Sequence, residues 1–421
     1  MDHSEQLLRE HLTLSRRYFL KAGVGLGTAG LAGLNTLKLL ASGTLSDEAF
    51  AKALSELSYL TNPEDFGTVE RGDPLPYKHS KEKRLEIGLE RDTWQLEVVA
   101  DPESNSKLDN PLSKEFGTAL TWDALMELAK TRAVRYMKIM TCLNVGEPLG
   151  MGLWEGVPLR DVIWLAKPVE NVRRVYYYGY HNDDPNQLFQ SSLPIGRVLE
   201  DPPGAMPILL CYKLNGKWLS GKRGGPARII VPDAYGFKSI KWLQRVVLTN
   251  RFNANDTYER GNNDIDSRMK SFARFIHYPK SIKAGEPIPL TGLAQVGMSG
   301  LRKVQIWLQP SRQKWPDDDP YFTKANWRDA ELLPPPTDWG SDFGTQLPPI
   351  PAQFDANGKP RRWPIENTKT HWAMLLRDVP AGKYSLRCRT INAKGYAQPM
   401  PRPFKKSGGN SIHRVRMTVK A

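Results

Sequence analysis

The alternation of apolar and polar residues changes near Pro279, and this change constrains the fold more than any other feature of the chain. Before Pro279, strand-like segments such as 136–141 are mixed with helical spacing, as in the stretch that begins at Thr121. After Pro279, short alternating segments separated by turns predominate, which is typical of a β-sandwich. The sequence therefore predicts an α+β chain, with a mixed α/β domain over residues 60–275 and a β-sandwich over 279–421.

Local signals support individual elements of both domains. Thr121 precedes helical spacing and predicts an N-capped helix, and Asn215-Gly216 is a hairpin turn signal. The strands that we expect in the second domain are 287–293, 304–308, 371–376 and 384–391. A Pro/Trp-rich insert over 315–364 interrupts them and predicts extended structure in an irregular surface loop.

The first residues of the chain predict an export signal. Ser15-Arg-Arg-Tyr-Phe-Leu-Lys21 is a twin-arginine sequence, and a weakly apolar stretch from Ala22 to Ala41 follows it. Lys38 interrupts that stretch and leaves it too short and too polar for a membrane-spanning helix. We therefore expect residues 1–51 to be a signal peptide and linker, and the mature protein to be periplasmic. The twin-arginine route carries folded proteins, which favours a protein that receives a cofactor before export.

Composition limits the chemistry. The chain has 59 Lys and Arg against 45 Asp and Glu, a net charge of +14, which favours anionic ligands. No nucleic-acid-binding motif is present, and export would remove that partner, so we expect none. Three cysteines are too few for a disulfide scaffold or an iron–sulfur cluster, and no Cys-x-x-Cys-His haem motif occurs.

Cys142 is the most suggestive single residue. It follows the strand-like segment 136–141 and precedes a Gly-rich loop, which would bring the main chain close to a bound group. A thiolate is a soft ligand for a transition metal, or a nucleophile when its pKa is depressed. The alternative is a small buried apolar residue, and Cys211 and Cys388 fit that interpretation because each lies inside a strand-like segment.

A second candidate site is the basic, Gly-rich stretch over residues 222–242. Its cations and donors are Arg223, Arg228, Lys238, Lys241 and Ser239, and Gly236 allows a tight turn among them. Convergent donors of this kind suit a phosphate-bearing ligand. The spacing is neither a P-loop nor a Rossmann motif, and a basic surface hairpin is the alternative interpretation.

Taken in order along the chain, these segments resemble the sulfite oxidase family of molybdopterin-dependent oxidoreductases. Thr141-Cys142 followed by Trp154-Glu-Gly-Val-Pro-Leu-Arg-Asp-Val162 resembles the family's Cys ligand and the stretch after it. Gly224-Gly-Pro-Ala-Arg-Ile-Ile-Val-Pro232 and Gly236-Phe-Lys-Ser-Ile-Lys-Trp-Leu243 look like its pterin-binding block. Residues 379–389 and 392–399 are similar to its C-terminal immunoglobulin-like dimerisation domain. The resemblance spans most of residues 60–420.

The resemblance implies roles for particular residues. Cys142 would bind molybdenum through its sulfur and be catalytic. The pterin and its phosphate would be held by Arg228, Ser239, Lys241, Gly236 and Arg223, the last standing where the family has a His.

Two further candidates rest on weaker similarity. Arg71 lies where the family places an N-terminal pterin contact. Tyr258, in Asn255-Asp-Thr-Tyr, resembles the family's active-site tyrosine and would donate a hydrogen bond to a metal-bound oxygen. A surface tyrosine in a polar loop is the alternative.

The chain departs from the family's sulfite-oxidising members after the ligand. Cys142-Leu-Asn-Val-Gly-Glu147 contains no arginine, and Glu147 would repel a dianion if it pointed inward. His181, in a polar loop, would either handle protons near the pocket mouth or be a solvated loop residue.

The resemblance implies a periplasmic molybdenum-pterin oxidoreductase that transfers an oxygen atom and two electrons, with sulfite or a related sulfur oxyanion as substrate. Its expected partners are a c-type cytochrome as external electron carrier and a second copy bound through the C-terminal domain. One alternative is a sulfoxide reductase of the same fold, since Ala234-Tyr-Gly-Phe-Lys238 resembles that branch. Another is a non-catalytic exported scaffold.

Overall fold

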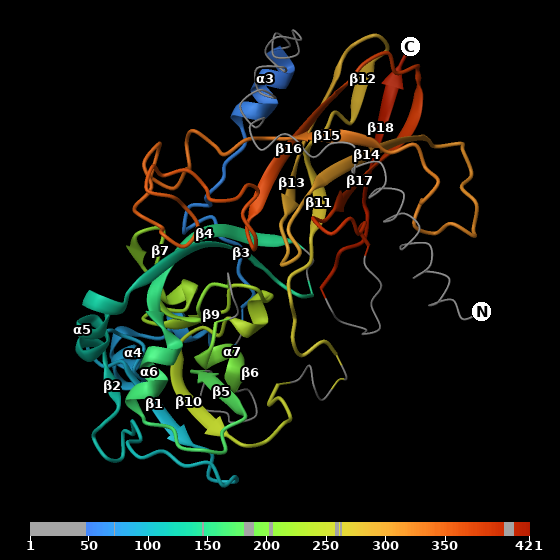
Figure 1. Cartoon of the computed structure of the whole chain (residues 1–421). Helices are drawn as coiled ribbons and strands as arrows, with labels where there is room; N and C mark the ends of the chain where they lie inside the picture. Colours follow the sequence, from blue (N-terminus) through green and yellow to red (C-terminus); the bar gives the residue numbers. More distant parts are fainter. Residues whose placement is uncertain are drawn as a thin grey trace.

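The computed structural model describes residues 48–70, 72–144, 147–180, 189–201, 205–256, 261, 263–399 and 408–421. Two β-rich parts lie side by side, the first with most of the helices and the second with the C-terminus (Figure 1). Within the described residues, no helix is long and apolar enough to cross a membrane. Nearly all of the predicted signal, residues 1–47, lies outside the described residues.

The first part contains two five-stranded sheets. In one the order is β2 (Leu120–Thr121), β1 (Gln95–Ala100), β10 (Leu243–Thr249), β5 (Arg174–Gly179) and β6 (Phe189–Pro194). In the other the order is β3 (Val134–Thr141), β4 (Pro148–Pro158), β7 (Leu209–Leu214) and β8 (Lys217–Trp218), and β9 (Arg228–Ile230) also pairs with β7. Only β1 and β10 of these strands run parallel. The mixed arrangement agrees with the predicted α+β character.

Short helices connect and cover these sheets. They are α4 (Lys81–Glu86), α5 (Trp122–Arg132), α6 (Leu159–Leu165) and α7 (Ile195–Leu199), with 3-10 turns η2 (Pro76–Lys78), η4 (Gly221–Arg223) and η5 (Gly236–Lys238). The helix α3 (Glu48–Ser55) instead lies against β13 (Ile288–Gln295) of the second part. The predicted N-cap is confirmed, because the Thr121 hydroxyl accepts a hydrogen bond from the backbone N–H of Ala124. The predicted hairpin is also confirmed, since Asn215 and Gly216 both have positive φ between β7 and β8.

One core fills the space between the two sheets and the helices. It includes Leu96 and Val246 of the first sheet, Leu125 of α5, Val162 of α6 and Ile229 of β9, all fully buried. Burying such side chains stabilises the fold by about 1.5–3 kcal/mol each, before conformational entropy is subtracted.

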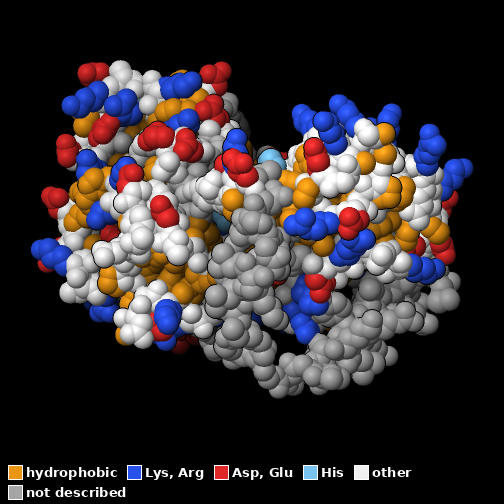
Figure 2. Space-filling view, turned by 90° about the horizontal axis from the view of Figure 1, so that it is seen from above, with side chains coloured by type: hydrophobic (Ala, Val, Ile, Leu, Met, Phe, Trp, Pro, Cys, Tyr) orange, Lys and Arg blue, Asp and Glu red, His pale blue; other side chains and the backbone are white. Residues whose placement is uncertain are grey.

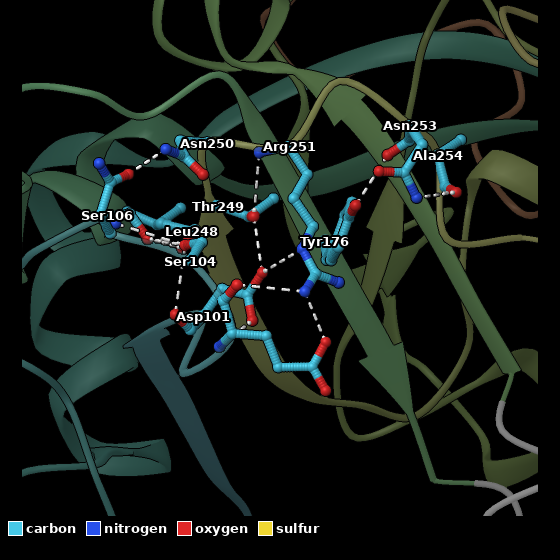
Figure 3. Close-up of polar contacts among 12 residues, drawn as sticks. Asp101, Ser104, Ser106, Tyr176, Leu248, Thr249, Asn250, Arg251, Asn253 and Ala254 are labelled. Atoms are coloured by element: carbon cyan, nitrogen blue, oxygen red, sulfur yellow. Dashed lines mark hydrogen bonds and ion pairs between the residues drawn. The ribbon is translucent and has the colours of Figure 1, made fainter.

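A polar network fixes the chain where it leaves β10 (Figure 3). The Thr249 hydroxyl donates to the Asp101 carboxylate at 2.7 Å, and the Ser106 hydroxyl donates to the carbonyl of Leu248 at 2.7 Å. The Tyr176 hydroxyl donates to the carbonyl of Asn253 at 2.7 Å. These bonds hold residues 249–254, which lead toward the predicted site residue Tyr258, against the first sheet.

The second part is one eight-stranded sheet wrapped around its own core. The order is β11 (Phe272–His277), β13 (Ile288–Gln295), β16 (Lys369–Leu376), β15 (Arg328–Leu332), β14 (Lys303–Pro310), β17 (Gly382–Ile391), β18 (His413–Lys420) and β12 (Ser281–Lys283). Strand β15 pairs with both β14 and β16 and so joins the two halves of the sheet. Side chains of both halves, including Leu290, Trp372, Ile306 and Leu386, meet in this core. The four strands predicted here are all present.

The Pro/Trp-rich insert over 315–364 is more ordered than a surface loop. It contains β15, and its Trp339, Ile350 and Phe354 are buried in a core that also includes Met137 and Ile139 of β3. The expectation of an irregular surface loop is wrong in this respect, because apolar side chains of the insert are buried between the two parts of the chain.

Candidate functional site

The end of β3 opens into a pocket that contains most of the predicted site residues. The pocket encloses about 710 Å3 of space between protein atoms, part of it open to solvent. Its lining includes Cys142 and the predicted clamp residues Arg223, Arg228, Gly236, Ser239 and Lys241. Segments separated by about a hundred residues in the sequence therefore converge on one site.

Arg228, at the start of β9, is held rigidly at the back of the pocket. It donates to the carbonyls of Arg223 at 2.8 Å and Ser239 at 2.6 Å, and its guanidinium lies 5.5 Å from the Trp154 ring centroid. Burial lowers its pKa to about 10. Its Nε is buried and has no hydrogen-bond partner among the described residues. A donor left in this state is available to a bound group.

Arg223 presents a second unused donor. Its Nη1 donates to the carbonyl of Gly67 at 3.1 Å, whereas its Nη2 is buried without a partner. Burial lowers the pKa of this guanidinium as well. The family's His at this position is thus replaced by a cation that does face the pocket.

Lys241 completes a group of three cations. Its ammonium donates to the Thr68 hydroxyl at 2.8 Å and to the carbonyl of Lys222 at 3.1 Å. Burial, followed by repulsion from Arg228 and Arg223, lowers its pKa to about 7. Within the described part of the chain, none of the three cations forms an ion pair with a carboxylate. The pocket therefore carries positive charge that only a bound anion would balance.

Ser239 and Gly236 shape the turn between these cations. The Ser239 hydroxyl accepts from the backbone N–H of Val231 at 3.1 Å, which leaves its own proton free to donate. A Cβ at Gly236 would lie 3.1 Å from the Met140 sulfur and 3.4 Å from the carbonyl oxygen of Thr141. Glycine therefore allows the turn to pack directly on the end of β3, beside Cys142.

Lys238, grouped with these cations on sequence grounds, does not line the pocket. Its buried ammonium forms an ion pair with Asp256 at 3.3 Å and donates to the carbonyl of Ser192 at 2.9 Å. It is a structural residue, because its charge is already compensated within the protein.

Sequence reasoning missed the contribution of the lead-in segment. Phe66, Gly67, Thr68 and Val69 line the pocket, and the Phe66 ring packs edge-on against Trp154 at 5.8 Å. This segment has no periodicity, and Gly67 is its one local signal of close backbone approach.

A second missed contribution comes from the C-terminal part, which hydrogen-bonds the free edge of β3. The Gln353 side chain accepts from the Met137 N–H at 2.7 Å and donates to the Met137 carbonyl at 3.0 Å. The Thr141 hydroxyl donates to the Gln295 side-chain oxygen at 2.5 Å, and both residues are fully buried. The strand that carries Cys142 is therefore positioned from both sides.

Glu147 does not point into the pocket. Its carboxylate accepts from Arg274 of β11 at 2.8 Å, its side chain is 61% exposed, and it is not among the lining residues. The concern that it would repel an anion near Cys142 is removed by this pairing. Arg71, Tyr258 and His181 lie outside the described residues, so their predicted roles stay predictions.

The surroundings of Cys142 restrict how a metal is held. Among the described residues, no group of three or more His, Cys, Asp or Glu side chains is placed to hold a metal ion. Cys142 is half-buried, whereas Cys211 and Cys388 are fully buried. A metal at this site would need further ligands from a bound cofactor, with the thiolate of Cys142 as the protein's soft donor.

Comparisons with known proteins agree with this geometry. Residues 84–257 match the family described as oxidoreductase molybdopterin binding domain. The NADPH nitrate reductase of Pichia angusta is 33% identical over 99 residues, which cover 24% of this chain and 11% of that protein. The sulfite oxidase of Gallus gallus is 33% identical over 99 residues, covering 23% of this chain and 21% of that one.

Two further relatives extend the comparison. The mitochondrial sulfite oxidase of Macaca fascicularis is 27% identical over 168 residues, 38% of this chain and 29% of that one. The crystal structure of the sulfane dehydrogenase SoxCD from Paracoccus pantotrophus matches with a TM-score of 0.53 and 17% identity, over 79% of each chain. At this identity the structural match shows a shared fold.

The curated relatives are matched over a minor share of their length, from 11% to 29% in these three cases. The matched segment 84–257 nevertheless contains Cys142 and every described clamp residue from Arg223 to Lys241. Residues 84–257 are therefore similar to the oxidoreductase molybdopterin binding domain, and parts of the chain are similar to sulfite oxidases and nitrate reductases.

Proposed function

We propose that the protein is a periplasmic molybdenum-pterin oxidoreductase that transfers an oxygen atom and two electrons, with sulfite or a related sulfur oxyanion as substrate. One observation carries the proposal. A single pocket places the half-buried thiol of Cys142 together with three cations that have no carboxylate partner, Arg223, Arg228 and Lys241. A pterin that carries both a metal and a phosphate requires these two kinds of protein group.

The residues present fit such a cofactor. Arg223 Nη2 and Arg228 Nε are buried donors without partners, and the lowered pKa of Lys241 reflects charge that an anion would stabilise. These three residues, with the Ser239 hydroxyl, would hold the phosphate and pterin through charge-assisted hydrogen bonds. Cys142 would bind the metal through its sulfur.

When bound, this group would supply a redox-active molybdenum that exchanges an oxygen atom and two electrons with a substrate. The chain's own residues would bind the cofactor, orient it and exclude water from it. Met140, Leu149 and Phe237 form an apolar wall that limits water near Cys142, and Gly236 brings the clamp against the end of β3. Thr141 and Gln295 hold the Cys142 backbone in place.

A sulfoxide reductase is the second candidate, and the same apolar wall favours it. Met140, Leu149, Phe189 and Phe237 line the pocket. Arg274, which contacts Glu147 in the segment after Cys142, already has that carboxylate as a partner. A neutral organic sulfoxide suits apolar surroundings better than a dianion does.

Export and electron transfer belong to the same proposal. The twin-arginine sequence Ser15–Lys21 supports a periplasmic location, and an exported cofactor enzyme would pass electrons singly to a separate carrier, such as a c-type cytochrome. A homodimer through the C-terminal part remains part of the proposal on the resemblance alone.

The decisive experiment is metal and pterin analysis of the natively exported protein, combined with thiol labelling. Because Cys211 and Cys388 are fully buried, a thiol reagent should label one cysteine, Cys142, in cofactor-free native protein and none in loaded protein. About one molybdenum per chain with Cys142 protected would support the proposal, and assays with sulfite and dimethyl sulfoxide would separate the two candidates. Exported protein without metal, and with Cys142 reactive, would refute both and favour the non-catalytic scaffold.

A further inference from the structure

One half of the eight-stranded sheet has an outer face whose charged side chains are all cationic. The adjacent strands β14, β17, β18 and β12 contain eight Lys or Arg residues and no Asp or Glu. Alternate residues such as Leu386, Cys388, Met417 and Val419 are buried in the core. Because successive side chains of a strand point to opposite faces, the intervening cations lie on the outside.

Five of these cations are exposed on the β17, β18 and β12 side, and we call this surface the cationic face. They are Lys283, Lys383, Arg414, Arg416 and Lys420. All four strands lie entirely within the described residues, and none of the five cations forms an ion pair with a carboxylate of that part of the chain. Nearby, the Glu286 carboxylate accepts from the backbone N–H of Lys283 at 3.2 Å.

Like charges are paired across these strands. Lys283 lies opposite Lys420, and Arg414 lies opposite Arg387. Burial, followed by repulsion from Arg414, lowers the pKa of Arg387. Like charges directly opposite one another destabilise a sheet, so the arrangement is unfavourable for the isolated chain.

Aromatic side chains of the insert cover the β14 side of the same surface. The Arg387 guanidinium lies 4.5 Å from the Phe322 ring and that of Arg389 lies 4.1 Å from the Trp327 ring, both rings belonging to the insert. Trp307 packs against the same aromatic group. This cover ends before β18, so the cationic face stays open to solvent.

The charge is concentrated in this part of the molecule. Residues 279–421 contain 23 Lys and Arg against 11 Asp and Glu, which accounts for +12 of the chain's +14. The space-filling view shows Lys and Arg gathered along the rim of the right-hand lobe, which corresponds to the part with the C-terminus in Figure 1 (Figure 2).

We propose that the cationic face binds a separate protein that presents an acidic surface. Carboxylates of such a partner would supply charge-assisted hydrogen bonds that the described part of the chain does not give these five cations. No exposed large apolar side chain lies on the four strands, so the face offers nothing to insert into a membrane. A second copy placed on this face by a two-fold axis would bring cations against cations, so a homodimer would have to use another surface.

The proposal does not depend on the chemistry proposed at Cys142, and its test uses the full-length exported protein. The probe is a fluorescent peptide of about 20 alternating Glu and Ala residues, with binding followed by anisotropy at about 50 mM and about 300 mM salt, because screening weakens exposed charge pairs. The test variant is Arg414→Glu with Arg416→Glu. The matched control is Lys107→Glu with Lys167→Glu, which makes the same change in net charge at exposed, unpaired cations of the first part.

We expect salt-sensitive binding that weakens at least about tenfold in the test variant and less than about twofold in the control. Equal binding by the test variant and the wild type would overturn the proposal. So would a preference for phosphatidylglycerol vesicles over the peptide, or a dimer that dissociates when Arg414 and Arg416 are reversed. If that variant does not fold, as judged by circular dichroism, Lys383→Glu with Lys420→Glu tests the same face.

Discussion

Raising the pH should weaken the hold of the pocket on a phosphate, and Lys241 should be the cause. In the cofactor-free protein, burial and two neighbouring cations lower the Lys241 pKa to about 7. A bound phosphate dianion would raise this pKa again, so binding takes up a proton wherever free Lys241 is neutral. Affinity is therefore highest below about pH 7 and falls as the pH rises through that value.

The size of the effect follows from the fraction of Lys241 that is protonated before binding. With a pKa of about 7, this fraction is about one half at pH 7 and about one hundredth at pH 9. If only the protonated form binds, the dissociation constant rises about 50-fold between these two values. The phosphate contributes little, because its second pKa is about 6 and it is mainly a dianion at pH 7 and above.

The assay is isothermal titration of a pterin phosphate monoester into cofactor-free protein at about pH 7 and about pH 9. A Cys142→Ala background removes the thiol, so that a metal bound at this residue does not contribute to the measured affinity. Lys241→Arg introduces a guanidinium, whose ordinary pKa is about 2 units or more above that of an ammonium, so it should stay largely charged at both pH values and bind with less pH dependence than Lys241. If the wild type and Lys241→Arg lose affinity equally, the argument from Lys241 is refuted.

Three other substitutions test the site. Cys142→Ser should abolish turnover while leaving the melting temperature within a few degrees, as measured by activity and circular dichroism, and wild-type activity would exclude Cys142 as the metal ligand. Thr141→Val leaves the buried Gln295 oxygen unsatisfied and should cost about 1–3 kcal/mol in urea unfolding, whereas Thr141→Ser keeps the hydroxyl and should cost less than half of that. Gly236→Ala places a Cβ 3.1 Å from the Met140 sulfur and should lower the amount of bound pterin per chain; unchanged pterin content would show that the turn can shift without cost.

The parts of the site that could be predicted are those encoded by local sequence. The alternation over 136–141 indicated the strand before Cys142, and the glycines and cations of 222–242 indicated a phosphate clamp, since both signals lie within a few residues of the groups concerned. The sequence did not indicate which lysine of the clamp faces the pocket. Lys238 and Lys241 are three residues apart, but Lys238 ends the 3-10 turn η5 and Lys241 follows it. The Lys238 ammonium donates to the carbonyl of Ser192, whereas that of Lys241 donates to the Thr68 hydroxyl.

The parts that could not be predicted depend on contacts between distant segments. Gln353 bonds Met137 across 216 positions, and Gln295 bonds Thr141 across 154, so no pattern within either segment signals the pairing. Glu147 is a similar case. Its position beside Cys142 suggested a charge in the pocket, and only the location of Arg274 in the fold shows that the carboxylate is directed elsewhere.

The net charge of the chain shows why composition alone misplaces a site. A charge of +14 is consistent with an anionic cofactor, yet residues 52–278, which contain the whole pocket, hold 31 Lys and Arg against 29 Asp and Glu. The pocket is cationic because Arg223, Arg228 and Lys241 are buried away from carboxylates, not because this part has a basic excess. The excess lies in residues 279–421, whose sheet carries the exposed cationic face. The net charge therefore does not distinguish two kinds of cationic site, whereas burial does. In the pocket, desolvated cations would bind a small anion tightly. On the cationic face, solvated cations would attract an acidic surface through an electric field that salt screens.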